Sequence, residues 1–507
     1  MQTRNLSLYA TIFVLASIEF LQLGMTAFAA APIMGEVSIS PEDFGFIAAV
    51  YASVAILSIS MQRWFVERIG GRRFIQGCTA ISVAGSILCA TSHDFDTFLV
   101  GRAVMALGGG ALFTSARMIA HHLLAGPRRF TGIKALASGL ALSLAAAPWL
   151  ASLAVSNETW SVMYWLLAIL GVLGFALASL SLPLGPLTVV GPRSSADPWQ
   201  QLLLVGGSFG LLYALQRFYY DFYGDAAFAS LGLGAALLAL LVYLRAQQHG
   251  VQPLLRLRQL LQLRYLAGLA LFGFAYMMLG ANNYVIPMML QRTLGYGWET
   301  VGRFEALGLV VAVLTWLVMS RLLPRYPSPR KFLVVGFLSL AAFGVLLARI
   351  DTSANLWFDI LPALAFNSIF LLTVLPVTAM QTFRELERDE SVYSNAQQVK
   401  NMMAQAGVAL GITVATLGQQ WRTAVHYGVL NAAINPDNPI YRDTIGRLQQ
   451  AMGTAIGPVQ ASRVAAAEVA QMLNQQAGML ANIDHFTLIA VLGLLGVVVT
   501  LVQRTFR

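Results

Sequence analysis

Long apolar runs, separated by short polar stretches, follow one another along almost the whole chain. Each run has roughly 20 residues, which as a helix is enough to cross a hydrocarbon core of about 30 Å. The runs do not alternate between apolar and polar positions, as the strands of a membrane barrel do. The pattern therefore predicts an all-α polytopic membrane protein with about fourteen spanning helices. These are expected near 8–31, 43–62, 73–92, 97–120, 131–154, 160–183, 199–217, 226–245, 264–290, 301–323, 331–349, 355–380, 395–419 and 484–503.

Composition agrees with this pattern, because 57% of the residues are hydrophobic and only 11% are charged. The net charge of +9 does not indicate a nucleic-acid partner, since the basic residues lie between the spans and not on one face. The two cysteines, Cys78 and Cys89, fall in one apolar run and are too far apart along a helix to form a disulfide. The first run is longer than the core of a signal peptide and contains Glu19, so we expect a first span that is retained.

The distribution of charge between the spans predicts the orientation of the chain. An even number of spans places both termini on one side, and most basic residues fall on that side, so the positive-inside rule makes it cytoplasmic. The basic residues assigned there are Arg4, the group within 63–73, Arg128, Arg129, Lys134, Arg193, Arg245, Arg256, Arg258, Arg264, Arg321, Arg325, Arg330, Lys331, Arg384, Arg388, Lys400, Arg504 and Arg507. The opposite loops carry mainly Glu36, Glu42, Asp43, Asp94, Asp96 and Glu158.

Two similar connections suggest that the chain contains a duplicated unit. "RWFVERIGGRR" (63–73) and "SRLLPRYPSPRKF" (320–332) are both short, basic and turned by Gly or Pro, at corresponding places of two sets of spans. We therefore expect a six-helix half over 1–190, a two-helix insert with its linker over 191–260, and a second six-helix half over 261–507.

One long connection, about 420–483, is too polar to span a membrane, yet "PVQASRVAAAEVAQMLNQQAGML" has a helical pattern and "NPDNP" predicts a turn. We expect a helical elaboration on the outer side. It would serve either as a lid or as a docking surface for a partner.

The 63–73 stretch resembles the signature loop of the major facilitator superfamily, Gly-x-Leu-Ala-Asp-Arg-x-Gly-Arg-Arg. Phe65 and Glu67 stand at the Leu and Asp positions, and Arg68, Gly70 and Arg72 match. Arg63 replaces the first Gly. Opposite charges at the helix ends would let such a loop act as a conformational latch of a moving bundle. The alternative is a basic loop that only sets the orientation of the chain and has no moving role.

Further stretches resemble the fourteen-span drug:proton antiporters of the EmrB and QacA type, in the same order along nearly the whole chain. They are "GRAVMALGGGA" from Gly101, "YVIPMMLQRTLGYGWETVG" from Tyr284, "ESVYSNAQQVKNMMAQAGVALG" from Glu390 and "LNQQAGMLANIDHF" from Leu473. Two features depart from that branch. The antiporter motif of the fifth span retains Pro148 as a hinge but has lost its glycines, and the acid of the first span is replaced by Leu23, with Glu19 one turn earlier on the same helix face.

Ionisable groups inside a bilayer are costly, so each one is a candidate for function. A carboxyl in apolar surroundings can exchange a proton near neutral pH, which makes Glu19 the first candidate for proton coupling. Its alternative role is structural, as a partner of a neighbouring helix and of Arg102 in particular. Arg102 is a coupling residue or one member of an interhelical ion pair. Glu305, beside Arg303 near the outer end of its span, is a second proton-site candidate.

The remaining candidates concern the substrate cavity. Polar and adaptable side chains in second-half spans would line a tolerant apolar site, although packing and interhelical hydrogen bonds are their alternative roles. These residues are Tyr276, Asn282, Asn283, Met288, Asn367 and Asn395. His121 and His122 are adjacent and point to different helix faces, so no metal site is expected there.

No phosphate-binding loop, His-Glu-x-x-His motif or nucleophile constellation occurs in the sequence, so we expect neither an enzyme nor a cofactor, and energy from an ion gradient. The resemblance implies a proton-coupled exporter of amphipathic toxic compounds, associated with antibiotic resistance, in the bacterial inner membrane. It also implies a periplasmic adaptor and an outer-membrane channel as partners. The alternatives are a carrier of one metabolite and a transporter-like sensor that binds a ligand without turnover.

Overall fold

The computed structural model describes residues 2–122, 127–157, 159–183, 193–250, 252–325, 328–386 and 390–506. Every regular element in these ranges is helical, which confirms the predicted all-α class. The elements are α1 (Gln2–Phe28), α2 (Ala30–Glu36), α3 (Pro41–Ile69), α4 (Gly71–Ala90), α5 (Phe95–Gly109), α6 (Leu112–His122), α7 (Pro127–Ser156), α8 (Val162–Ser181), α9 (Pro198–His249), η1 (Leu257–Leu260), α10 (Leu263–Met288), η2 (Met289–Thr293), α11 (Trp298–Arg325), α12 (Pro329–Leu347), η3 (Leu356–Ile360), α13 (Leu361–Phe383), α14 (Glu390–Asn431), α15 (Pro439–Ile456) and α16 (Pro458–Val502).

Thirteen helices in the described part are long and apolar enough to cross a membrane. The sequence predicted about fourteen spans, and the difference concerns α9, where only Ala226–His249 meets the criterion. α9 is nevertheless a hairpin of two antiparallel arms. Gly207 lies against Leu240, Gly210 against Ala236, and Gln247 donates a hydrogen bond to Gln200 at 2.7 Å. A straight helix would hold residues 200 and 247 roughly 70 Å apart.

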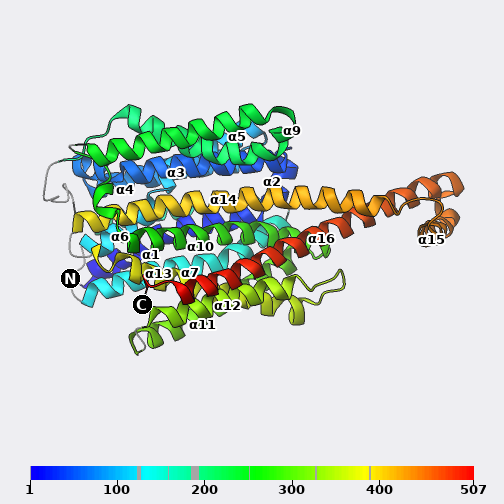
Figure 1. Cartoon of the computed structure of the whole chain (residues 1–507). Coiled ribbons are helices and arrows are strands. Elements are labelled where there is room, and N and C mark those ends of the chain that lie inside the picture. Colours follow the sequence, from blue (N-terminus) through cyan, green and yellow to red (C-terminus); the bar gives the residue numbers. More distant parts are fainter. Residues whose placement is uncertain are drawn as a thin grey trace.

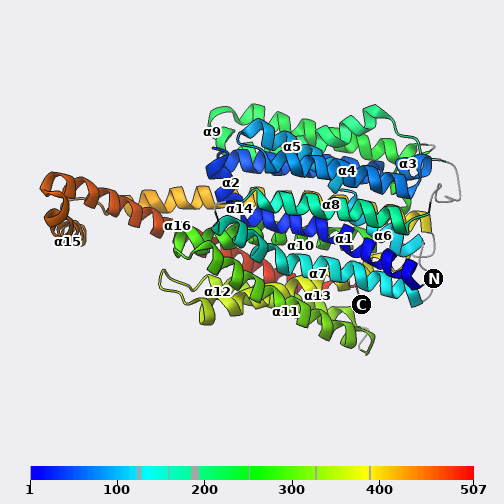
Figure 2. The ribbon, with the colours of Figure 1, turned by 180° about the vertical axis from the view of Figure 1, so that it is seen from behind.

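The bundle is built from two groups of helices that face each other (Figures 1 and 2). In the first group, α1 packs on α6, α7 and α8, while α4 packs on α5 and α8. In the second, α10 packs on α13 and α14, and α12 packs on α13 and α16. The groups meet mainly where α3 contacts α14 and where α7 contacts α11. The α9 hairpin lies against α3 and α14.

Local sequence signals fix several helix starts. Ser40 and Asp43 form a reciprocal capping box before α3, with Pro41 at the first helical position. Asp94 caps α5, because its carboxylate accepts hydrogen bonds from the backbone N–H of Thr97 at 2.9 Å and from its hydroxyl at 2.8 Å. These hydrogen bonds hold the pKa of Asp94 below its usual value.

A helical stalk, made of the end of α14, α15 and the start of α16, projects from the bundle on the side opposite to both termini (Figure 1). This confirms that the polar segment 420–483 is helical, with a turn at "NPDNP". At its base, Asp484 of α16 binds two side chains of α14: Arg422 Nε and His426 Nε2 both lie 2.6 Å from its Oδ2. Ionic contacts therefore hold α14 and α16 together at the base of the stalk.

Candidate functional site

Glu19 lies in the middle of α1 and joins the two helix groups. Its Oε1 accepts a hydrogen bond from Gln405 Nε2 of α14 at 2.5 Å. Its Oε2 is buried and has no hydrogen-bond partner in the described part of the chain. A buried carboxyl oxygen without a donor is costly when it is ionised, which makes it a natural place for a proton.

Lys400 faces the same region from α14, and sequence reasoning missed it. The tally of basic residues placed it on the side of the termini, but the structure buries it inside the bundle with only 4% of its surface exposed. Its Nζ lies 5.4 Å from the ring centroids of Phe113 and Phe272 and 5.5 Å from that of Tyr276. It is close enough to interact electrostatically with Glu19. A lysine within an apolar run was the available signal, but only the fold reveals that it faces a carboxyl.

Arg102 of α5 is not the partner of Glu19, so that expectation is wrong. Its guanidinium donates to Gln22 Oε1 at 2.8 Å and lies over the ring of Tyr51, 4.3 Å from the centroid. No carboxylate of the described residues lies within ion-pair distance of it. Gln22 is the reason, because it stands one turn beyond Glu19 on α1 and presents its amide oxygen to α5.

A cavity of about 40 Å³ lies beside Arg102, between α1, α3, α5 and α14. The first helix group contributes the polar side chains of Gln22, Thr26, Tyr51 and Arg102, and the second contributes that of Gln405. The volume is enough for water but far below the roughly 300–1,000 Å³ of a typical small-molecule pocket. The bundle is therefore closed around this site.

A second cavity of about 30 Å³ contains Glu305 of α11. Asn282 and Asn283 of α10, Asn367 of α13 and Pro148 of α7 also line it. Glu305 is half-buried, and its Oε1 is enclosed without a hydrogen-bond partner among the described residues. Asn282 Nδ2 donates to Asn367 Oδ1 at 2.9 Å, so two predicted cavity residues form an interhelical hydrogen bond.

Pro148 lies in the contact between α7 and α11, where the two helix groups meet. A Cβ added to Gly302 of α11 would overlap the side chain of Ser152 and lie 2.7 Å from the carbonyl oxygen of Pro148. Phe28 and Trp298 stack edge to face nearby, with centroids 5.5 Å apart. The stalk end of the contact between α7 and α11 is therefore tightly packed.

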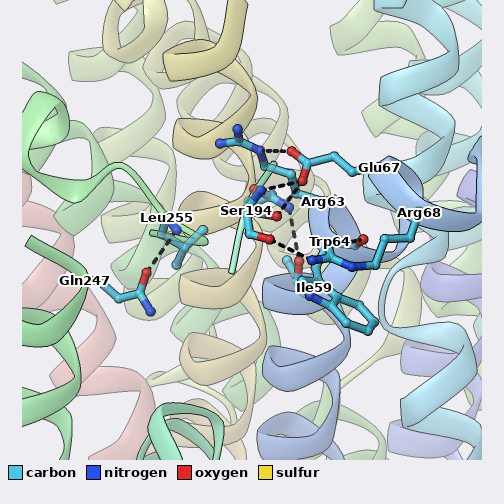
Figure 3. Close-up of polar contacts among 9 residues, drawn as sticks. Ile59, Arg63, Trp64, Glu67, Arg68, Ser194, Gln247 and Leu255 are labelled. Carbon is cyan, nitrogen blue, oxygen red and sulfur yellow. Dashed lines mark hydrogen bonds and ion pairs between the residues drawn. The ribbon is translucent and has the colours of Figure 1, made fainter. Parts of the chain in front are cut away.

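The 63–73 loop is tied to the segment that leads into α9 (Figure 3). Glu67 Oε1 accepts from Arg63 Nε at 2.6 Å, while its Oε2 accepts from both the backbone N–H and the hydroxyl of Ser194 at 2.7 Å. Arg68 donates to the carbonyl oxygens of Trp64, at 3.2 Å, and Ser194, at 3.1 Å.

Gly70 separates α3 from α4 with φ of 84°, a conformation that side chains with a Cβ rarely adopt. The glycine that matches the signature is therefore required by the backbone conformation of this turn. Arg72 follows directly in α4, and its Nε is buried without a hydrogen-bond partner in the described ranges.

The other predicted cavity residues are dispersed. Tyr276 contributes one of the rings around Lys400, and Met288 packs at the end of α10 against the core. Asn395 is fully buried, and neither atom of its amide has a hydrogen-bond partner within the described part. The side chains of His121 and His122 lie outside the described residues.

Two groups of membrane-spanning helices that meet around small internal cavities are the architecture of a membrane transporter. The sequence model of the Major Facilitator Superfamily matches residues 12–412. The chain belongs to this superfamily.

Relatives with established names share low sequence identity with the chain. The colistin resistance protein EmrB of Acinetobacter baumannii is 22% identical over 429 residues, covering 82% of this chain and 80% of that protein. The lincomycin resistance protein LmrB of Listeria monocytogenes is 23% identical, covering 67% and 72%. The putative multidrug resistance protein MdtD of Escherichia coli is 22% identical, covering 75% and 78%. These names support the predicted branch of multidrug efflux transporters.

Solved structures share the fold. A bacterial homologue of the human lysosomal transporter Spinster, in an inward-facing and unoccupied conformation, superposes with a TM-score of 0.59 at 14% identity, covering 100% of this chain and 98% of that one. An autoinhibited peptide transporter of the POT family gives 0.58 at 17% identity, covering 94% and 96%. At these identities the likeness concerns the architecture of the bundle.

Proposed function

We propose that the protein is a proton-coupled secondary transporter that exports amphipathic toxic compounds by alternating access. The observation that carries this proposal is the position of Glu19, a carboxyl on α1 that has one buried oxygen and accepts a hydrogen bond from Gln405 on α14 of the opposite helix group. A charge change at such a site alters the contact between the halves. Protonation can therefore be linked to their movement.

Lys400 extends this role. When Glu19 is ionised, the ammonium of Lys400 on α14 of the opposite half compensates part of its charge. When Glu19 is protonated, the attraction between the halves at this point is lost. Glu305 offers an independent proton site, because its enclosed Oε1 has no partner in the described part of the chain and it faces the asparagine-lined cavity.

Substrate binding requires opening of the bundle. The cavities of about 40 Å³ and 30 Å³ are too small for an amphipathic drug, which needs roughly ten times that space. Rocking of the halves would enlarge the space around Arg102, Asn282 and Asn283. The loop of Glu67, Arg68, Gly70 and Arg72 would act as a latch during this movement, and Pro148 as a hinge.

The domain boundaries, orientation and location belong to the same proposal. We assign 1–190 and 261–507 to the two halves and 191–260 to the insert. Both termini are placed in the cytoplasm of a bacterium, with the chain in the inner membrane, because the basic residues gather at the end of the bundle that carries the termini.

The stalk then projects into the periplasm, where a periplasmic adaptor and an outer-membrane channel are its proposed partners. Val429 and Ile440 are 69% and 76% exposed on it, and Val459 is 70% exposed, which suits a protein contact. The salt-bridged base formed by Asp484 would hold the stalk at a fixed angle for docking.

The first experiment measures proton movement in everted membrane vesicles that contain a fluorescent pH probe. Lipophilic cations and weak acids are added to vesicles with the wild type or Glu19→Gln. We expect a compound-dependent proton release that is lost in the variant. Gln503→Glu, outside the bundle core, serves as a control for altered charge, and unchanged release by Glu19→Gln would contradict the assignment.

Two alternative functions remain distinguishable in the same assay. The loss of the fifth-span glycines around Pro148 is compatible with a carrier of one metabolite, which would respond to one compound class only. A ligand sensor would bind compounds and release no protons.

A further inference from the structure

A large pocket, here called the stalk-end pocket, lies between the two helix groups at the end of the bundle from which the stalk projects. Its volume is about 650 Å³, within the roughly 300–1,000 Å³ of small-molecule sites. The first group lines it with α2, the end of α7 and Trp160, which precedes α8. The second group lines it with η2 and with Trp298, the first residue of α11. Figures 1 and 2 show α2 at this end of the bundle.

Glu36 of α2 and Arg292 of η2 bring opposite charges to the pocket from the two groups. Both side chains are exposed. Glu36 Oε2 accepts a hydrogen bond from the indole N–H of Trp160. Neither the other oxygen of Glu36 nor the guanidinium of Arg292 is hydrogen-bonded or ion-paired to any residue that the structure describes. One acceptor and one charged donor are therefore available to a ligand.

Two tryptophans give the pocket an aromatic wall. Trp160 is only 3% exposed, and its ring meets those of Phe98 and Tyr164 edge to face, with centroids 5.9 Å apart in both pairs. A tryptophan enclosed in this way does not belong to a belt that faces lipid. Trp298 is half-buried and packs edge to face on Phe28. Neighbouring rings therefore hold both indoles in place at the pocket.

The wall that carries Arg292 is held by α16. Gln475 Nε2 donates a hydrogen bond to the backbone carbonyl oxygen of Thr293 at 2.6 Å, and Asn482 Nδ2 donates to its hydroxyl at 3.1 Å. Thr293 follows Arg292 directly in η2. These contacts fix the backbone beside Arg292, so its guanidinium stays on the second side of the pocket.

The stack of Phe28 on Trp298 stands between this pocket and the cavity that contains Glu305. Phe28 lines the cavity, whereas Trp298 lines the pocket. Gly302, one helical turn after Trp298, lies in the tight contact with Ser152 of α7. A compound that leaves the cavity between α7 and α11 on this side would therefore enter the stalk-end pocket.

We propose that the stalk-end pocket is a second binding site, for amphipathic zwitterions with an aromatic body. Its place on the exit route rests on the proposed export function. The free oxygen of Glu36 binds the cationic group of the ligand, and the faces of the tryptophan rings attract the same cation. Arg292 binds the carboxylate of the ligand, and the aromatic body packs on Trp298. A compound that is only cationic gains nothing from Arg292 and is repelled by it.

The test compares two fluorescent probes that differ by one charge. Tetramethylrhodamine is a zwitterion with a free carboxylate, and its methyl ester is a cation. Each probe is titrated with the full-length protein in phosphatidylcholine nanodiscs, and fluorescence anisotropy gives the dissociation constant. Nanodiscs without protein give the background that comes from binding to lipid.

Two variants remove the charges of the pocket one at a time. Glu36→Gln keeps an acceptor for the indole of Trp160, and Arg292→Gln keeps a polar side chain of similar length. The matched controls are Asp96→Asn and Arg349→Gln, which remove the same charges from exposed positions that do not line the pocket.

We expect the wild type to bind the zwitterion more tightly than the ester. An exposed charge contact changes a dissociation constant about two- to fivefold. Arg292→Gln should weaken binding of the zwitterion by this factor without weakening binding of the ester. Glu36→Gln should weaken binding of both probes, and the controls should bind as the wild type does.

Equal affinity of the wild type and both pocket variants for the zwitterion overturns the proposal. It is also overturned if Arg292→Gln weakens the ester as much as the zwitterion, since the carboxylate then plays no part. The measurement needs no proton movement. Failure of the proton-release assay would therefore refute the proposed function and leave the binding result unchanged.

Discussion

The contact between α7 and α11 allows a direct test of alternating access. In Gly302→Ala, the new Cβ overlaps the side chain of Ser152 and lies 2.7 Å from the carbonyl oxygen of Pro148. Ordinary contact needs about 3.4 Å, so the helices must separate by roughly 0.7 Å or more. Overpacking of this kind costs about 1–3 kcal/mol, and it acts only while the stalk ends of the halves are closed.

A cost confined to one conformation shifts the equilibrium towards the other by about 5–150-fold. The assay follows the rate at which a maleimide labels Asn283→Cys, which lines the Glu305 cavity, in purified protein whose two natural cysteines are replaced by alanine. We expect faster labelling in Gly302→Ala by a factor in that range.

Gly308→Ala is the matched control on the same helix. Its Cβ would lie 2.5 Å from that of Leu364 in α13, so the strain falls within one half. This variant should lose thermal stability while labelling of Asn283→Cys stays unchanged. If Gly302→Ala labels no faster than Gly308→Ala, the contact between α7 and α11 is static packing and the reasoning is refuted.

Three further predictions concern single contacts. Lys400→Gln should abolish proton-driven transport and lower the yield of folded protein, and adding Glu19→Gln should restore the yield but not transport, because both buried charges are then gone. Asn367→Leu should destabilise the fold by about 1–3 kcal/mol, since the amide of Asn282 loses its acceptor, and a thermal melt measures this. Asp484→Asn should speed hydrogen exchange in the stalk, whereas Glu468→Gln on α16 should not, because only Asp484 binds Arg422 and His426.

The sequence by itself determined the class of fold and the helical stalk. Apolar runs of spanning length admit only helices in this setting, because every backbone group must be satisfied within its own segment. "NPDNP" and Gly70 each predict a change in chain direction, because their backbone preferences favour turns. The 63–73 loop could be located by its resemblance to the signature loop of the superfamily.

The tertiary structure decided which charges meet. Glu19 and Lys400 are separated by 380 positions, and no periodicity within α1 or α14 shows that these helices face each other. Arg102 donates its hydrogen bond to Gln22 and not to Glu19 because of how α5 packs against α1, and the sequence does not show that packing.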